Sequence, residues 1–465
     1  MTSIERARDI AQWTLDFDPA ALPEAAITQA KHLVLDTLGC ALAALAEDEA
    51  LSICDAVETM GGAPQATLIG RNIKTSAAGA ALANGALLRF LDLNDFLMDR
   101  SNGASIGGHP SDNIGPVLAV AEWCDVSGLE TIGAIAACYE IFARLNGMMN
   151  RTDGWDSTTV SAFAVAAVSA RMMGLDAEAT AHAVALAASR AATPGVVRGG
   201  NISAAKYLAN AMIAHTAVEC AVMAAHGLTG PLEVMENARG LGTLFYLEGT
   251  EQVFKEPIKD PCSMIWSSIK AYPCLATGQT VATAAIPLAA KIKGRLDEIE
   301  TITITMADNP MIRRQQTDPG RVDPRSREAA DHSFPFIAAV SLMDGMLTTR
   351  QYANERWNAP DIRALMARMV FDTDASLSTR APGGYPSAIR IVMTGGETFT
   401  AEALEAPGMS HGGIPRDAVI DKFALTTAGL LTDARRTRLR DMVLDLENLP
   451  SIQPMMTELA APITT

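Results

Sequence analysis

The stretch that decides the fold is Ile202–Leu228, ISAAKYLANAMIAHTAVECAVMAAHGL, which is long, rich in small apolar side chains and closed by a glycine. Ser157–Leu175, STTVSAFAVAAVSARMMGL, has the same character. Short side chains let helices approach each other closely, so both stretches predict buried helices. The first half of the chain is therefore predicted to be helical.

Helix starts can be located in the same half. Segments 2–13 and 127–145 each open with Thr or Ser followed three residues later by Glu, which is the capping-box spacing. Apolar residues then recur at helical spacing in the second segment.

The pattern changes after about Asp260. The segment 299–307, IETITITMA, alternates apolar and polar side chains, which predicts a strand. The segment 387–403 alternates in the same way and is broken by Gly395-Gly396, which predicts a hairpin. An apolar segment, 334–346, lies between them, so we predict a smaller α+β domain.

From residue 415 to 449 the chain returns to an amphipathic helical pattern. A chain of 465 residues is too long for one ordinary core. We therefore predict a mainly α fold in which residues 1–265 and 408–465 form one large all-α domain. Residues 266–407 are expected to form an inserted α+β lid domain.

The composition of the chain limits which partners it can bind. Its net charge of −16 would repel a phosphate backbone, which argues against nucleic acid as a partner. The seven cysteines contain no CxxC pair, which argues against zinc-finger and iron–sulfur sites and suggests free thiols. The N-terminus lacks the apolar core of a signal peptide, and no membrane span is expected. We predict a cytoplasmic protein that binds neither nucleic acid nor membrane.

A long loop is predicted between Phe90 and Ile114, and loops of this length inside a compact domain are often functional. It contains Asp92, Asp95 and His109. A histidine there can act as an acid or base near neutral pH. Alternatively, the aspartates cap helices and His109 satisfies a buried carbonyl.

Several other charged or polar side chains lie in apolar surroundings. Lys206 lies in the alanine-rich helix, where lysine seldom lacks a partner, and Arg198 precedes a Gly-Gly turn. Each also fits a structural role as a surface lysine, a turn or a salt bridge. The same two interpretations apply to Lys270, Tyr272, Asp331 and His332.

In this order, these segments resemble the MmgE/PrpD family over nearly the whole chain. That family includes 2-methylcitrate dehydratases, cis-aconitate decarboxylases and iminodisuccinate epimerases. The most specific segment is 91–123, whose HPSDN at 109–113 is most similar to the dehydratase branch. The resemblance implies an active site between the two domains, a homodimer, and no metal or organic cofactor.

The resemblance also places Asp92, His109 and Lys206 at active-site positions. We expect His109 to be the principal acid/base residue, with Asp92 orienting it or sharing the proton transfer. Asp156 is expected to be a second proton carrier. Lys206 is expected to stabilise the carboxylate of a small-molecule substrate. The predicted substrate-binding residues are Ser111, Arg198, Lys270, Tyr272 and His332.

The chain departs from the family pattern at three places. Asp156 stands where many members have histidine, and Phe336 stands where the decarboxylases have tyrosine. YPCLATGQ at 272–279 lacks the Arg and His that many members carry. We predict a cofactor-independent dehydratase of a branched hydroxy tri- or dicarboxylate such as 2-methylcitrate. The alternatives are an epimerase of an acidic dicarboxylate, a cis-aconitate-type decarboxylase, or an inactive helical binding protein.

Overall fold

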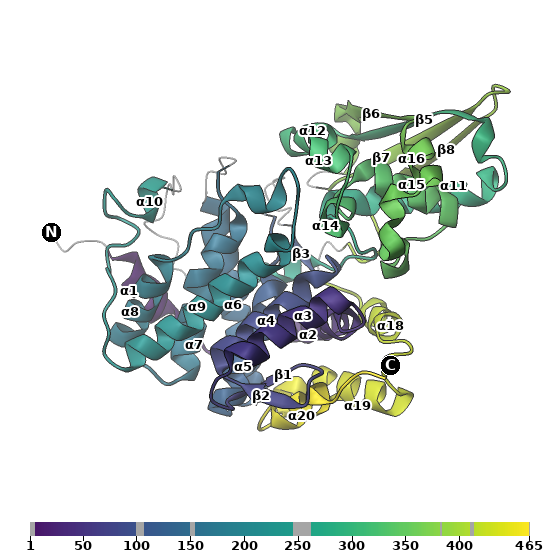
Figure 1. Ribbon diagram of the computed structural model, residues 1–465. Coiled ribbons are helices and arrows are strands. Elements are labelled where there is room, and N and C mark those ends of the chain that lie inside the picture. The colour runs from purple at the N-terminus through teal and green to yellow at the C-terminus, as the bar shows by residue number, and fades with distance from the viewer. Residues whose placement is uncertain are drawn as a thin grey trace.

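Two clusters of buried apolar side chains organise the fold (Figure 1). The computed structural model describes residues 5–98, 107–148, 154–244, 262–381, 384–409 and 413–464. The larger core takes side chains from 7–269 and from 414–459, so both ends of the chain contribute to it. The smaller core comes mainly from 274–403, joined by Phe96 and Met98. The fold is mainly α with small sheets.

The larger core is built around α9 (Ala205–Ala225), which packs against α4 (Ala77–Phe90), α7 (Ser161–Met172) and α8 (Ala177–Ala188). The approach is close: a Cβ added at Gly85 of α4 would lie 3.5 Å from the Cβ of Ala211. Both helices predicted from small residues are therefore confirmed. The neighbouring helices are α1 (Arg6–Asp16), α2 (Glu24–Ala44), α3 (Asp48–Met60), α5 (Ile114–Cys124), α6 (Gly128–Met148) and α10 (Leu241–Leu244).

α9 is also long and apolar enough, by length and composition alone, to cross a membrane. Over half of its most apolar window is buried inside the fold, among α4, α7 and α8. Its hydrophobicity is thus accounted for by packing in the larger core.

The predicted helix start at residue 127 is confirmed, because the Glu130 N–H donates to Ser127 Oγ over 3.2 Å at the beginning of α6. The other predicted start, at Thr2, lies outside the described residues. The helix that follows it, α1, begins at Arg6.

The smaller core is a four-stranded sheet covered by helices, seen in green in Figure 1. The strand order is β6-β5-β7-β8, with β5 and β6 parallel and the other two pairs antiparallel. The predicted strand and hairpin are confirmed, and the apolar segment forms α15, which packs on α11. The strands are β5 (Ile299–Ala307), β6 (Met369–Asp374), β7 (Ser387–Met393) and β8 (Thr398–Ala403). The helices are α11 (Gln279–Ile292), α12 (Pro310–Thr317), α13 (Pro319–Val322), α14 (Arg327–Ala330), α15 (Phe334–Asp344), α16 (Pro360–Met366) and α17 (Ala375–Arg380).

The C-terminal segment returns to the larger core, where α18 (Arg416–Thr426) and α19 (Asp433–Leu444) pack against α2. The amphipathic helical pattern predicted at 415–449 is confirmed, and the structure divides it into these two helices. The break contains Gly429, whose φ of +76° is left-handed and ends a right-handed helix. A last helix, α20 (Gln453–Ala460), completes this segment.

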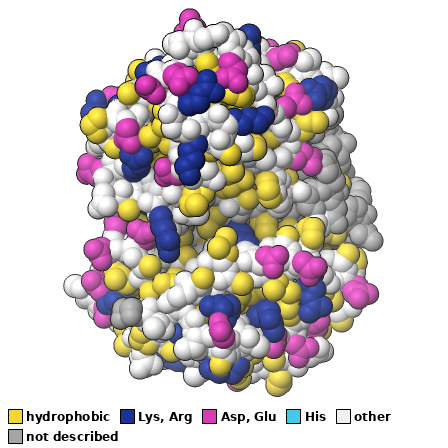
Figure 2. Space-filling view, turned by 90° about the vertical axis from the view of Figure 1, so that its right-hand side faces the viewer, with side chains coloured by type: hydrophobic (Ala, Val, Ile, Leu, Met, Phe, Trp, Pro, Cys, Tyr) yellow, Lys and Arg dark blue, Asp and Glu magenta, His cyan; other side chains and the backbone are white. Residues whose placement is uncertain are grey.

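Short strand pairs complete the topology. β1 (Ala66–Leu68) pairs with β2 (Ile73–Thr75), and β3 (Phe96–Leu97) pairs with β4 (Ser267–Ser268). The second pair matters for function, because it lies between the two cores and brings the chain after α4 next to the chain before α11. On the face that Figure 2 shows, acidic and basic side chains are interspersed and hydrophobic ones lie across the middle.

Candidate active site

Asp92 lies at the centre of a buried group of charged side chains. It follows α4 directly and has a left-handed φ of +51°, which is uncommon for a residue other than glycine. Its Oδ1 pairs with Arg89 at the end of α4 and lies 2.6 Å from Lys270 Nζ. Lys270 also donates to the Asp92 carbonyl over 3.0 Å. These contacts hold the unusual backbone and keep the pKa of Asp92 well below its ordinary value, against the effect of burial.

Lys206 supplies the link to the smaller core. Its Nζ donates to both carboxylate oxygens of Asp331, over 2.8 and 2.7 Å, and lies 3.5 Å from Asp92 Oδ2. Lys206 is 1% exposed, so this is a fully buried ion pair. Asp92 Oδ2 has no hydrogen bond among the described residues. This buried oxygen therefore faces the Lys206 ammonium without a hydrogen bond.

His332 is the neighbour of Asp331 in the chain and the last member of this buried group. Its Nδ1 bonds Asp331 Oδ1 and lies 3.7 Å from Asp92 Oδ2. Burial lowers the pKa of His332 to about 3, so the ring is neutral at pH 7. An ionised carboxylate only accepts, so Nδ1 carries the proton and Nε2 keeps its lone pair.

The carboxylates and imidazole have the spacing of a metal site, since ligand atoms of Asp92, Asp331 and His332 lie within 4.8 Å of one another. The Lys206 ammonium already supplies a positive charge to both carboxylates. A divalent ion here would have to displace or repel that ammonium, so the donor set fits a metal poorly.

His109 lies close enough to Asp92 for the charge of that carboxylate to act on its ring. Its Nδ1 is 2.5 Å from the carbonyl oxygen of Asp95, which can only accept, so Nδ1 carries the proton and Nε2 the lone pair. Burial places the pKa of His109 well below its ordinary value, helped by the charges of Arg89 and Lys270. The neutral ring is thus in the form that a general base requires.

The contact that orients His109 differs from the prediction. We expected the carboxylate of Asp92 to hold the ring, but the backbone carbonyl of Asp95 does so. The alternative, that His109 satisfies a buried carbonyl, therefore describes this contact. The Asp95 carboxylate is held in turn by Tyr139 Oη at 2.9 Å and Ser111 Oγ at 2.5 Å.

Ser111 connects Asp95, whose carbonyl holds His109, with Asn94, which bonds Arg89. Its Oγ donates to Asp95 and accepts from Asn94 Nδ2 over 2.8 Å. Asn94 also donates to Asp112 over 2.7 Å and accepts from Arg89 over 3.2 Å. Because these bonds use both the donor and an acceptor site of the hydroxyl, Ser111 acts here as a positioning residue.

Two further predicted residues pair with each other. Arg198 Nε lies 2.5 Å from Asp156 Oδ2, and Asp156 Oδ1 caps the Thr158 N–H over 3.0 Å. Arg198 and these bonds lower the pKa of Asp156, so it is an ionised structural partner in this arrangement. Arg198 remains close enough for its charge to act on His109.

Tyr272 and Phe336 are placed in the smaller core. Tyr272 packs against that core, and its backbone N–H donates to Gln279 Oε1 over 3.1 Å. Phe336 is fully buried, with its ring centroid 5.4 Å from that of Tyr352. The structure thus groups Asp92, Lys206, Lys270 and His332 tightly. His109 and Ser111 are held by the neighbouring Asp95, whereas Tyr272 lies against the smaller core.

Several members of the site were not predicted. Arg89 is a buried cation and Lys422 a partly buried one, and the signal of each was a charge beside apolar residues. Lys422 donates to the Leu93 carbonyl over 2.7 Å. Asp331 was noticed only as a neighbour of His332. Tyr139 gave no signal, because an apolar helix with one tyrosine fits a plain core helix.

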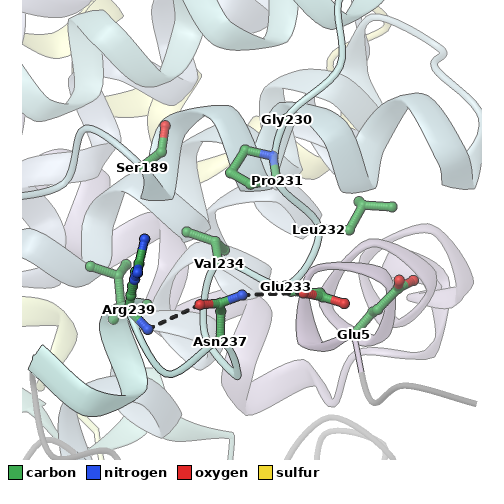
Figure 3. Close-up of a pocket in the computed structure, with 11 residues that line it drawn as sticks. Glu5, Ser189, Gly230, Pro231, Leu232, Glu233, Val234, Asn237 and Arg239 are labelled. Carbon is green, nitrogen blue, oxygen red and sulfur yellow. Dashed lines mark hydrogen bonds between the residues drawn. The ribbon is translucent and has the colours of Figure 1, made fainter.

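A cavity of about 530 Å³ lies elsewhere, beside α1 and α8 (Figure 3). Its wall includes Glu5, Ser189 and Glu233, and Asn237 Nδ2 donates to Glu233 over 3.3 Å. None of the predicted site residues lines it. Part of the predicted loop, residues 99–106, lies outside the described residues.

Comparison with known proteins agrees with the sequence resemblance. Residues 8–252 match the MmgE/PrpD N-terminal domain and residues 272–448 match the MmgE/PrpD C-terminal domain. The chain belongs to the MmgE/PrpD family.

Three curated relatives cover most of the chain. The 2-methylcitrate dehydratase of Salmonella typhimurium is 26% identical, covering 95% of this chain and 94% of the relative. That of Cupriavidus necator is 27% identical over 86% and 85% of the two chains. The cis-aconitate decarboxylase of Mus musculus is 23% identical over 95% and 90%.

Proposed function

We propose that this protein is a hydro-lyase that eliminates water from a branched hydroxy tri- or dicarboxylate such as 2-methylcitrate. The observation that carries the proposal is the buried Arg89, Lys206 and Lys270 around Asp92, whose Oδ2 has no hydrogen bond among the described residues. Two of the relatives above are named 2-methylcitrate dehydratase, and they support the same class of reaction.

The elimination needs a base next to a carboxylate and cations to receive the growing negative charge. His109, neutral and with its Nε2 lone pair, takes the proton. Lys206 and Lys270 hold the substrate carboxylate and stabilise the enolate-like intermediate. The neutral His332 holds its only proton on Nδ1 against Asp331, so His109, once protonated, passes the proton it has taken to the departing hydroxyl, which leaves as water. Arg198 reaches the substrate by exchanging its Asp156 partner for a substrate carboxylate.

Epimerisation is a weaker alternative, since it needs a second base facing His109. Asp156 was the residue expected there, and its pairing with Arg198 and its cap to Thr158 occupy its oxygens. Decarboxylation is therefore the second candidate, because the relative named cis-aconitate decarboxylase covers nearly the same length.

The wider assignments belong to the same proposal. The sheet-containing segment, 266–407, acts as a lid over a helical domain formed by 1–265 and 408–465. The enzyme works as a cytoplasmic homodimer on a small carboxylate, without nucleic acid, membrane or added cofactor.

The test is an activity screen on chelator-treated protein with 2-methylcitrate, citrate and cis-aconitate, following alkene absorbance and carbon dioxide. We expect alkene from the hydroxy acid, undiminished by chelator. His109→Ala should lower kcat about a hundredfold or more. His226→Ala is the matched control, because His226 is exposed at the end of α9. If cis-aconitate releases carbon dioxide and neither hydroxy acid yields an alkene, the reaction is decarboxylation and the proposed dehydration is wrong.

A further inference from the structure

Arg321 of α13 is a buried cation that the proposed chemistry does not use. It is 7% exposed, and its Nη2 donates to the Arg198 carbonyl over 2.7 Å. Its Nε and Nη1 have no hydrogen bond among the described residues. The nearest paired carboxylate oxygen is Asp318 Oδ2, 3.8 Å from Nε. Leaving guanidinium donors buried and unbonded is costly, and the ion pair with Asp318 is too long to be a hydrogen bond, so Nε and Nη1 lack a hydrogen-bonded anionic partner.

The fold fixes Arg321 beside the site. Gly200 N–H donates to Asp318 Oδ2 over 3.2 Å, and a Cβ added at Gly320 would lie 2.0 Å from the Gly200 carbonyl oxygen. The turn before Arg321 is therefore packed directly on the loop after Arg198. Burial lowers the pKa of Arg321 to about 10, and the charge of Asp331 partly opposes that shift. The side chain is still a cation at neutral pH, and it lies close enough to the site to interact electrostatically with Asp331.

We propose that Arg321 binds a substrate carboxylate remote from the reacting carbons and so selects tricarboxylates over dicarboxylates. This inference rests on the proposed function, since it takes a polycarboxylate as the ligand. A guanidinium offers a planar pair of N–H donors that matches a carboxylate. Lys206 beside Asp92 receives one end of the substrate, and Arg321 beside Arg198 receives another.

The geometry also explains why this contact would discriminate. A tricarboxylate supplies the missing partner to Nε and Nη1, whereas a dicarboxylate leaves them buried and unbonded. Sites built around a buried polar group reject ligands that fail to satisfy it. The discrimination therefore has two sources: the hydrogen bonds that a tricarboxylate makes to Arg321, and the free-energy cost of leaving the guanidinium unbonded when a dicarboxylate binds.

The test is calorimetric binding to the full-length protein. The probes are propane-1,2,3-tricarboxylate, which has no hydroxyl to lose, and methylsuccinate. Arg321→Gln should weaken the tricarboxylate about tenfold or more and methylsuccinate less than about twofold. Arg321→Lys keeps the charge but lacks the planar pair of donors, so its affinity for the tricarboxylate should lie between those of the wild type and Arg321→Gln. Arg325→Gln is the matched control, because Arg325 is exposed and pairs with Asp323 over 2.5 Å.

The outcomes separate this inference from the proposed function. The inference is overturned if Arg321→Gln and Arg321→Lys lower the affinity for both probes equally, or change the affinity for neither. Arg321 would then only link the two loops. If the wild type dehydrates 2-methylcitrate in that case, the proposed function stands alone. If the wild type and Arg321→Gln differ as expected while no hydroxy acid is dehydrated, the subsite stands and the reaction is wrong.

Discussion

Lys206 Nζ lies 2.7 Å from Asp331 Oδ2, and this buried ion pair joins the two cores of the molecule. Lys206 comes from α9 in the larger core, and Asp331 lies three residues before α15 in the smaller one. The carboxylate of Asp331 is shared with His332. The charged site is therefore complete only when the two cores are packed together.

The first prediction concerns that pair. Asp331→Asn leaves the Lys206 ammonium buried with only the more distant Asp92, so the free energy of unfolding should fall by about 3–5 kcal/mol. Urea denaturation followed by circular dichroism measures the change. The double variant Lys206→Met/Asp331→Leu removes both charges and should be closer to the wild type in stability, although inactive. Equal stability of Asp331→Asn and the wild type would contradict the role of the pair.

Much of the fold was predictable, because its main signals are local. Alternation at 299–307 and small residues at 202–228 each follow from the period of one element. The position of the break between α18 and α19 was not predicted, because the residues on both sides keep a helical pattern. Gly429, with its left-handed φ of +76°, lies in that break.

Part of the membership of the site was predictable, but its pairings were not. Lys206 and Asp92 stand out because a charge inside an apolar segment needs a partner. The partner of Lys206 is Asp331, 125 residues further along the chain, and no local pattern encodes that distance. The same limit explains why the ring of His109 was assigned to Asp92 rather than to the Asp95 carbonyl.

The second prediction uses the neutral His332. Its pKa is about 3 in the fold and 6.5 ordinarily, so the unfolded chain binds the extra proton as the pH falls below 6.5. This group therefore removes stability on acidification, about 2 kcal/mol by pH 5. His332→Gln cannot titrate, so its unfolding free energy should fall less than that of the wild type between pH 7.5 and 5. Parallel curves would show that His332 keeps its ordinary pKa in the fold.

The third prediction tests the close approach of two loops. Gly320→Ala would place a methyl group 2.0 Å from the Gly200 carbonyl oxygen, so the loops must separate. We expect a loss of about 1–3 kcal/mol in stability, measured by thermal unfolding, and weaker tricarboxylate binding. Gly395→Ala is the matched control, because nothing lies within 4 Å of its added Cβ. A stable Gly320→Ala variant with unchanged affinity would mean that the loops have room to spare.

The last prediction concerns Lys270, which burial and the neighbouring Arg89 and Lys206 hold at a pKa of about 8, while Asp92 opposes the shift. Above pH 8 this lysine loses its charge, so the affinity for an anionic substrate should fall, and kcat/KM with it. Lys270→Arg keeps the charge and should move that alkaline limb to higher pH.

Stability should change in the opposite direction. The ordinary pKa of lysine is 10.5, so between about pH 8 and 10.5 the unfolded chain holds the proton that the folded chain has released. The contribution of Lys270 to the unfolding free energy therefore rises with pH while activity falls, which separates its titration from alkaline unfolding. Steady-state rates and urea denaturation of the wild type and Lys270→Arg over pH 7–10 measure both trends. An identical alkaline limb in the two proteins would assign the loss of activity to another group.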